Sequence, residues 1–162
     1  MCVNSCFNST FANGMGHTEC VCHLIEAGAR IDHADRSGLS AIHYATDGEH
    51  RSTVQRLIEL GADPNAKDSN LQWTPLLRCS GLKNNGNTEV ARQLIIMGAR
   101  IDEQDVHGKT ALHNAIICKH APLCQLLLEN GASLKIETKV IGYPSFPRTT
   151  YGSPCGLCFV CT

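Results

Sequence analysis

The chain has 162 residues and a formal net charge of −1, a length that fits a single domain. Its Lys and Arg residues form no cluster, so we expect no direct binding to nucleic acid. No segment approaches the ~18 consecutive apolar residues of a membrane span, and the N-terminus shows neither the basic region nor the apolar run of a secretory signal. We therefore expect a cytoplasmic or nuclear protein in which the ten cysteines stay reduced.

Residues 1–34 predict one helix near their end, because apolar side chains recur at helical spacing at Val21, Leu24 and Ile25. This helix resembles the second half of a two-helix unit. The first half, around residues 7–13, has no recognisable pattern. The segment is interpreted either as a degenerate N-terminal cap or as the cut edge of a longer array.

Residues 35–67 predict a hairpin tip followed by two short helices. The tip is residues 35–38, and Ser40 occupies an N-cap position, where its hydroxyl can accept a hydrogen bond from a free backbone N–H. The second helix carries an apolar stripe that includes Leu57. Gly61 ends it, because helix C-termini often require a residue in the left-handed region.

Residues 68–104 repeat this pattern with four extra residues. Thr74 is the predicted N-cap, and Pro75 follows at the first helical position, where its missing N–H costs nothing. One extra residue falls in the tip, residues 68–73, and three fall near residues 81–86, between the two helices. Insertions in repeated units map to loops.

Residues 105–137 return to the standard length, with Thr110 as the predicted N-cap. The second helices of the three units place Leu57, Leu94 and Leu127 at equivalent positions. We predict that these three leucines are buried in one continuous core.

The repeated pattern stops in the tail, residues 138–162, which we expect to be disordered. It is interpreted as a truncated or alternative end of a longer array, or as a tail that folds back on the last unit. The tail contains Cys155, Cys158 and Cys161, the one spacing in the chain that resembles a metal site. A structural zinc site needs four ligands, and these are three. An inert tail is therefore favoured, and the alternative is a small thiol protein whose cysteine cluster binds metal or senses redox state.

Two phrases recur along the chain with a period of about 33 residues. A Gly-Ala pair begins the first phrase at Gly28, Gly61, Gly98 and Gly131, at steps of 33, 37 and 33 residues. The second phrase has the form Thr-Pro-Leu-His-x-Ala and occurs as residues 40–45, 74–79 and 110–115, with Ala, Leu or Cys replacing some letters.

These phrases resemble the signature of the ankyrin-repeat family, and the resemblance covers residues 12–137. Residues 73–80 resemble more particularly the ankyrin part of fibronectin type III and ankyrin repeat proteins. The resemblance implies an all-α solenoid of paired antiparallel helices with hairpin fingers. It also implies a protein–protein interaction module, an adaptor or scaffold, with another protein as its partner. We expect a monomer with no enzymatic activity, no cofactor and no metal site.

Partner contacts in this family lie at the fingertips and on the exposed side of the first helices. The residues at these positions here are Arg36, Ser37, Leu39, Asp47, Trp73, Val106, His107, Lys109 and Cys118. Their charges have both signs, so the sequence implies no charge type for the partner. Trp73 has two readings of equal weight, as an aromatic anchor for the partner or as a side chain packed on its own finger.

The resemblance also assigns roles to His43, His113 and Asn65. The two histidines occupy the signature position, where the family's histidine is structural and bonds to a neighbouring hairpin. Asn65 resembles a substrate of an asparaginyl hydroxylase, with Leu57 eight residues before it. The simpler and favoured reading is that the Asn65 side chain bonds its own turn.

Overall fold

The computed structural model describes residues 18–81 and 87–138 of the chain. These residues form helices and connecting segments without any strand, so the predicted all-α fold is confirmed. The helices in chain order are α2 (Thr18–Glu26), α3 (Ala41–Asp47), α4 (Arg51–Glu59), α5 (Pro75–Gly81), α6 (Thr88–Ile96), α7 (Ala111–Ile117) and α8 (Ala121–Glu129). None of the described helices is long and apolar enough to cross a membrane.

Several sequence predictions concern residues outside this range. The unit before α2 lies in residues 1–17, and most of the insertion after α5 lies in residues 82–86. The tail after residue 138, with its three cysteines, is also outside the described residues.

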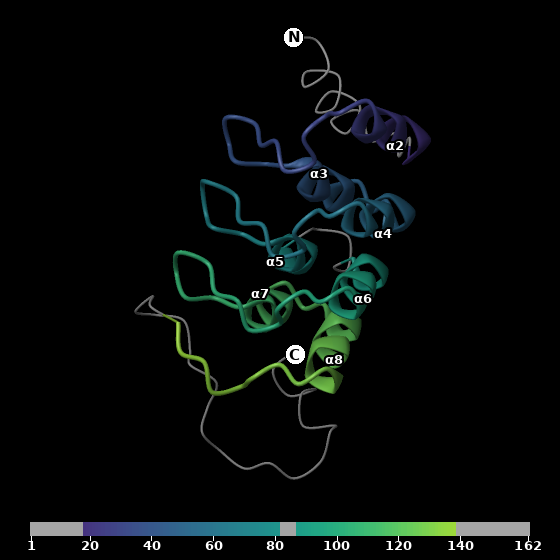
Figure 1. Cartoon of the computed structure of the whole chain (residues 1–162). Helices are drawn as coiled ribbons and strands as arrows, with labels where there is room; N and C mark the ends of the chain where they lie inside the picture. Colours follow the sequence, from purple (N-terminus) through teal and green to yellow (C-terminus); the bar gives the residue numbers. More distant parts are fainter. Residues whose placement is uncertain (1–17, 82–86, 139–162) are drawn as a thin grey trace.

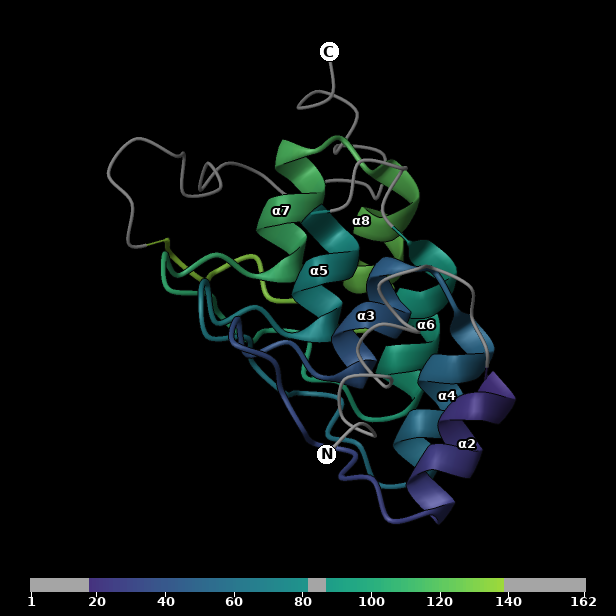
Figure 2. The ribbon, with the colours of Figure 1, turned by 90° about the horizontal axis from the view of Figure 1, so that it is seen from above.

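The helices stack in two layers (Figure 1). The first helices α3, α5 and α7 pack in one row, and α2, α4, α6 and α8 pack in a second row behind it. The segments before α3, α5 and α7 project from the same side of the stack as three parallel fingers, and the view from above shows the same arrangement (Figure 2). The main contacts among the described helices are within one unit or between neighbouring units, as in a solenoid.

The predicted caps begin the first helices. Ser40 and Thr110 are the N-caps of α3 and α7. Pro75 opens α5, and the hydroxyl of Thr74 accepts a hydrogen bond from the backbone N–H of Leu77 at 3.3 Å. These contacts satisfy donors that have no partner within the helix.

The predicted glycines end the second helices. Gly61 and Gly98 have φ angles of 101° and 93°, which only glycine adopts without strain. The turn then closes on the helix, because the N–H of Ala62 donates to the carbonyl of Leu57 at 2.9 Å. The chain therefore reverses toward the next finger directly after each helix.

The core lies between the two layers and runs through all the described units. The side chains of Leu57, Leu94 and Leu127 are each 0% exposed, as predicted. Burial raises the pKa of the Cys79 thiol. Cys79 holds a position that alanine holds in the units on either side. Small side chains at this position let the first helices approach closely.

A buried histidine contacts the N-cap of the first helix in each standard unit, and His43 also contacts the segment just before the second finger. The backbone N–H of Ser40 donates to Nδ1 of His43 at 3.1 Å, and Nε2–H of His43 lies 3.0 Å from the carbonyl of Ala66, which accepts. The ring is therefore neutral, with its proton on Nε2. Thr110 and His113 repeat the first contact. The structural role assigned to these histidines fits these contacts.

We predict that Leu94→Ala lowers the free energy of unfolding by about 2–5 kcal/mol, because it leaves a cavity in a fully buried position. Ile96→Ala is the matched control, since this residue of the same helix is 69% exposed. Urea unfolding followed by circular dichroism measures both. Equal stability of the two variants would show that the core is assigned wrongly.

We also predict that stability falls as the pH drops below about 6.5, the pKa of histidine in the unfolded chain. Burial lowers the pKa of His43 most, the nearby Arg78 guanidinium lowers it further, and the Ala66 carbonyl and Asp68 only partly offset them. Burial lowers the pKa of His113 as well. The unfolded chain therefore binds these protons more readily than the folded one.

His43→Leu tests this pH dependence, because Leu77 occupies the same position in the middle unit and fits there. The melting temperature of the variant should depend less on pH between neutral and mildly acidic solution than that of the parent. An unchanged pH dependence would assign the effect to other groups.

Candidate functional site

The candidate site is the face made by the three fingers and the first helices α3, α5 and α7, here called the finger face (Figure 1). Neighbouring fingertips are joined by backbone hydrogen bonds. The N–H of Ser69 donates to the carbonyl of Ser37 at 3.0 Å, and the N–H of Val106 donates to the carbonyl of Leu71 at 3.1 Å. The fingers therefore form one continuous surface.

An aspartate at the base of each finger holds its backbone in place. The Oδ1 atoms of Asp35, Asp68 and Asp105 each accept hydrogen bonds from two or three backbone N–H groups of their own finger. The Asp35 bonds, from Ser37 and Leu39, measure 2.8 and 2.9 Å. A charged acceptor makes such bonds stronger than neutral ones.

The second carboxylate oxygen of each aspartate binds a different side chain. In the first finger, Oδ2 of Asp35 accepts the hydroxyl of Tyr44 at 2.6 Å. This hydrogen bond raises the pKa of Tyr44 to about 12. Burial raises the pKa of Asp35, but the bonds from Tyr44, Leu39 and Ser37 outweigh it and the net shift is downward.

In the second finger, Arg78 takes the place of the tyrosine. Its guanidinium donates to Oδ2 of Asp68 at 3.2 Å and to Oδ1 of Asp47 at 2.8 Å. Burial lowers the pKa of Arg78, but the two carboxylates outweigh it and raise the pKa. Asp47, a predicted partner contact, is thus engaged in linking the first unit to the second.

In the third finger, the partner comes from the preceding unit. The indole N–H of Trp73 donates to Oδ2 of Asp105 at 3.2 Å. The ring also covers the end of α5, because a Cβ placed on Gly81 would lie 2.8 Å from the nearest ring atom. Trp73 is half-buried. Its ring thus contacts α5 and the next finger, whereas the packing predicted for it was on its own finger, and its role as an anchor for a partner stays a prediction.

The other predicted contact residues lie along the same face. Arg36, Val106, His107 and Cys118 are exposed, and Ser37, Leu39 and Lys109 are half-buried. Whether these residues contact a partner stays a prediction.

Two exposed apolar residues of this face were absent from the sequence-based set. Leu71, at the tip of the lengthened finger, is 37% exposed, and Ile117, at the end of α7, is 48% exposed. Ile117 stands seven residues after its N-cap, the same offset that placed Asp47 in the set. The repeat pattern could therefore have predicted Ile117. It could not have predicted Leu71, because the residue inserted in that finger shifts Leu71 out of register with the other fingers.

Asn65 does not have the hydrogen bonds expected from sequence. Its own turn is held by Asp63, whose Oδ1 accepts the N–H of Asn65 at 2.8 Å. The Asn65 side chain instead reaches the next unit, where its amide donates to the carbonyl of Gly98 at 3.3 Å and its oxygen accepts the N–H of Arg100 at 2.7 Å. Hydroxylation of Asn65 stays a prediction, which the mass of a peptide spanning residues 57–67 from native protein checks.

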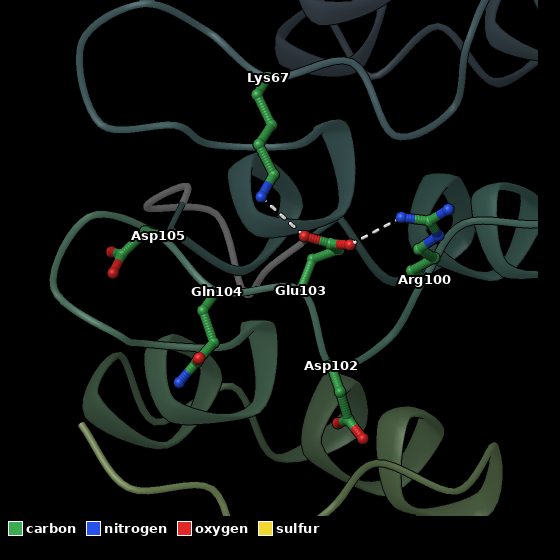
Figure 3. A pocket seen from close by; sticks show the side chains of 6 residues that line it. All are labelled: Lys67, Arg100, Asp102, Glu103, Gln104 and Asp105. Carbon is green, nitrogen blue, oxygen red and sulfur yellow. Dashed lines mark hydrogen bonds and ion pairs between the residues drawn. The ribbon is translucent and has the colours of Figure 1, made fainter. Parts of the chain in front are cut away.

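A pocket between the stems of the second and third fingers is lined mainly by charged side chains (Figure 3). It is lined by Lys67, Arg100, Asp102, Glu103, Gln104 and Asp105. Glu103 lies between Lys67 at 2.7 Å and Arg100 at 3.1 Å, and hydrogen bonds from these two cations lower its pKa. Since Lys67 belongs to the first unit and Glu103 to the second, this ion pair is a polar link between the two units.

We predict that Gly81→Ala displaces the indole of Trp73, since the added methyl group and the ring cannot occupy their present positions together. Trp73 is the one tryptophan of the chain, so its fluorescence reports the change directly. Emission should shift to longer wavelength as the ring becomes more exposed, while circular dichroism stays that of the parent. Unchanged emission would place the ring elsewhere.

Comparisons with known proteins agree with this architecture. The model of a family described as ankyrin repeats in three copies matches residues 10–68 and 68–138.

Among the groups of His, Cys, Asp and Glu in the described residues, none could hold a metal ion.

Several curated proteins are similar over part of the chain. The glycerophosphocholine phosphodiesterase gde1 of Schizosaccharomyces pombe is 36% identical over 94 residues, which is 58% of this chain and 8% of that protein. The human SH3 and multiple ankyrin repeat domains protein 1 is 40% identical over 80 residues, 49% of this chain and 4% of that protein.

The potassium channel AKT2/3 of Arabidopsis thaliana is 31% identical over 125 residues, 76% of this chain and 15% of that protein. The chain thus spans a small fraction of each of these relatives. The resemblance to fibronectin type III and ankyrin repeat proteins stays a prediction. The match of the family model over most of the chain shows that the chain belongs to the ankyrin-repeat family.

Proposed function

We propose that this chain is a non-enzymatic adaptor that binds another protein through its finger face. Ankyrin repeats are a known protein–protein interaction module. The observation that carries the proposal is the placement of exposed apolar side chains. The four large ones in the described residues are Leu71, Ile96, Val106 and Ile117, and three of them lie on the finger face. Grouped exposed apolar residues mark interaction sites.

The titratable groups at the base of the fingers support a binding role over a catalytic one. Asp35, Asp68 and Asp105 hold backbone N–H groups, and His43 bridges a helix cap and a carbonyl. Each of these groups is engaged in building the finger face. A general base or nucleophile needs instead to reach a substrate atom.

The proposal includes a monomer in the cytoplasm or nucleus. Cys79 and Cys124 are buried as free thiols, which suits a reducing compartment. The alternative of a metal-binding or redox-sensing thiol protein depends on Cys155, Cys158 and Cys161. They lie outside the described residues, and no observation on the described part of the chain favours that alternative.

We predict that Leu71→Ser combined with Ile117→Ser abolishes capture of the native partner from cells, because these side chains are exposed in the free protein. The matched control is Ile96→Ser, which removes an exposed isoleucine from the second row of helices. Quantitative mass spectrometry of crosslinked complexes compares the three proteins. Retention of every captured protein by the double variant would exclude the finger face as the binding surface.

Trp73 is avoided in this experiment, because its bond to Asp105 and its packing on Gly81 make Trp73→Ala a change in both surface and structure. The melting temperature of each variant provides the check that the fold is retained.

A further inference from the structure

The finger face carries an uneven distribution of charge, which the sequence alone did not show. In residues 68–81 and 105–120, the acidic residues are Asp68 and Asp105. These two aspartates are 3% and 5% exposed, and both carboxylates accept hydrogen bonds within the fingers. They are therefore turned inward and offer no negative charge to a partner.

The cations of the same segments are placed differently. Arg78 is held between two carboxylates. Lys119 is exposed directly after α7, and Lys109 is half-buried at the root of the third finger. With His107 exposed at the tip, the accessible charge of residues 105–120, which form the third finger and α7, is positive.

The first unit is different, because it presents both signs. Arg36 is exposed at its fingertip, and Glu49 is exposed after α3 at the position that Lys119 holds after α7. Asp47 is half-buried and paired with Arg78. A preference for one sign of charge is thus confined to the third finger and α7.

The second and third units carry the exposed apolar residues of the finger face. Leu71 and Val106 lie on adjacent fingertips that are joined by a backbone hydrogen bond. Trp73 extends from the root of the second finger to Gly81 at the end of α5. Ile117 holds the equivalent position on α7, which packs beside α5. We call Leu71, Trp73, Val106 and Ile117 the apolar strip.

We propose that the apolar strip binds a segment of a partner protein that carries apolar side chains next to Asp or Glu. The inference rests on the proposed function and names the partner chemistry of that site. Apolar side chains of the segment remove the strip from water. Its carboxylates lie near Lys109 and Lys119, where opposite charges favour encounter and disfavour basic competitors.

A random peptide display library, selected on the immobilised full chain, tests this chemistry without knowledge of the partner. The expected result is enrichment of peptides that combine apolar residues with a net negative charge. The affinity of a selected peptide, measured through the fluorescence of Trp73, should fall as salt concentration rises. Enrichment of basic or of uncharged polar peptides would overturn the inference.

Two variants assign the binding to the strip and to its charge. Leu71→Ser with Val106→Ser should weaken a selected peptide by about tenfold or more, while the matched Ile96→Ser control binds as the parent does. Lys109→Glu with Lys119→Glu should turn the selection toward basic peptides. Glutamate is tolerated after α7, since Glu49 adopts φ 60° where Lys119 adopts φ 61°.

The outcomes separate the two levels of the proposal. Peptides that bind but are insensitive to both double variants would refute the apolar strip and leave an interaction module that uses another surface. Selection of no peptide, together with loss of no partner in the crosslinking experiment above, would contradict the proposed function itself.

Discussion

The finger face depends on one interaction, the bond between an aspartate and the backbone N–H groups of its own finger. A finger has no helix or sheet to satisfy these donors, and backbone N–H groups are strong hydrogen-bonding groups that need a partner. Asp35, Asp68 and Asp105 meet this need in the same way in every unit. The shape of the fingers is thus fixed locally, and the surface they form is available for recognition.

The second oxygen of each aspartate distinguishes the units. Tyr44 binds it in the first unit, Arg78 in the second, and Trp73 in the third. The tyrosine bond stays within its unit. Arg78 and Trp73 each link two units, so the same side chains that shape the finger face also couple neighbouring fingers.

This coupling explains why the accessible charge of the finger face differs from the charge that the sequence predicted for it. The predicted contact positions include Asp47, which suggests a face of mixed sign. In the structure Arg78 holds this carboxylate, and the aspartates of the second and third fingers are buried. The basic residues Lys109 and Lys119 then dominate the accessible charge of the third finger and α7. The fold is shared with proteins of unrelated activities, so function is argued from such exposed residues.

The sequence by itself determined the repeat, the order of helices and the core. N-caps, left-handed glycines and apolar stripes act within one unit, over a few residues, so the identities of Ser40, Gly61 and Leu94 are sufficient to predict their roles. Tertiary structure decided the rest. Trp73 reaches Asp105 across 32 residues, Arg78 reaches Asp47 across 31, and Asn65 reaches Arg100 across 35. These contacts require the stacking of one unit on the next, which sets side-chain distances that no local pattern encodes.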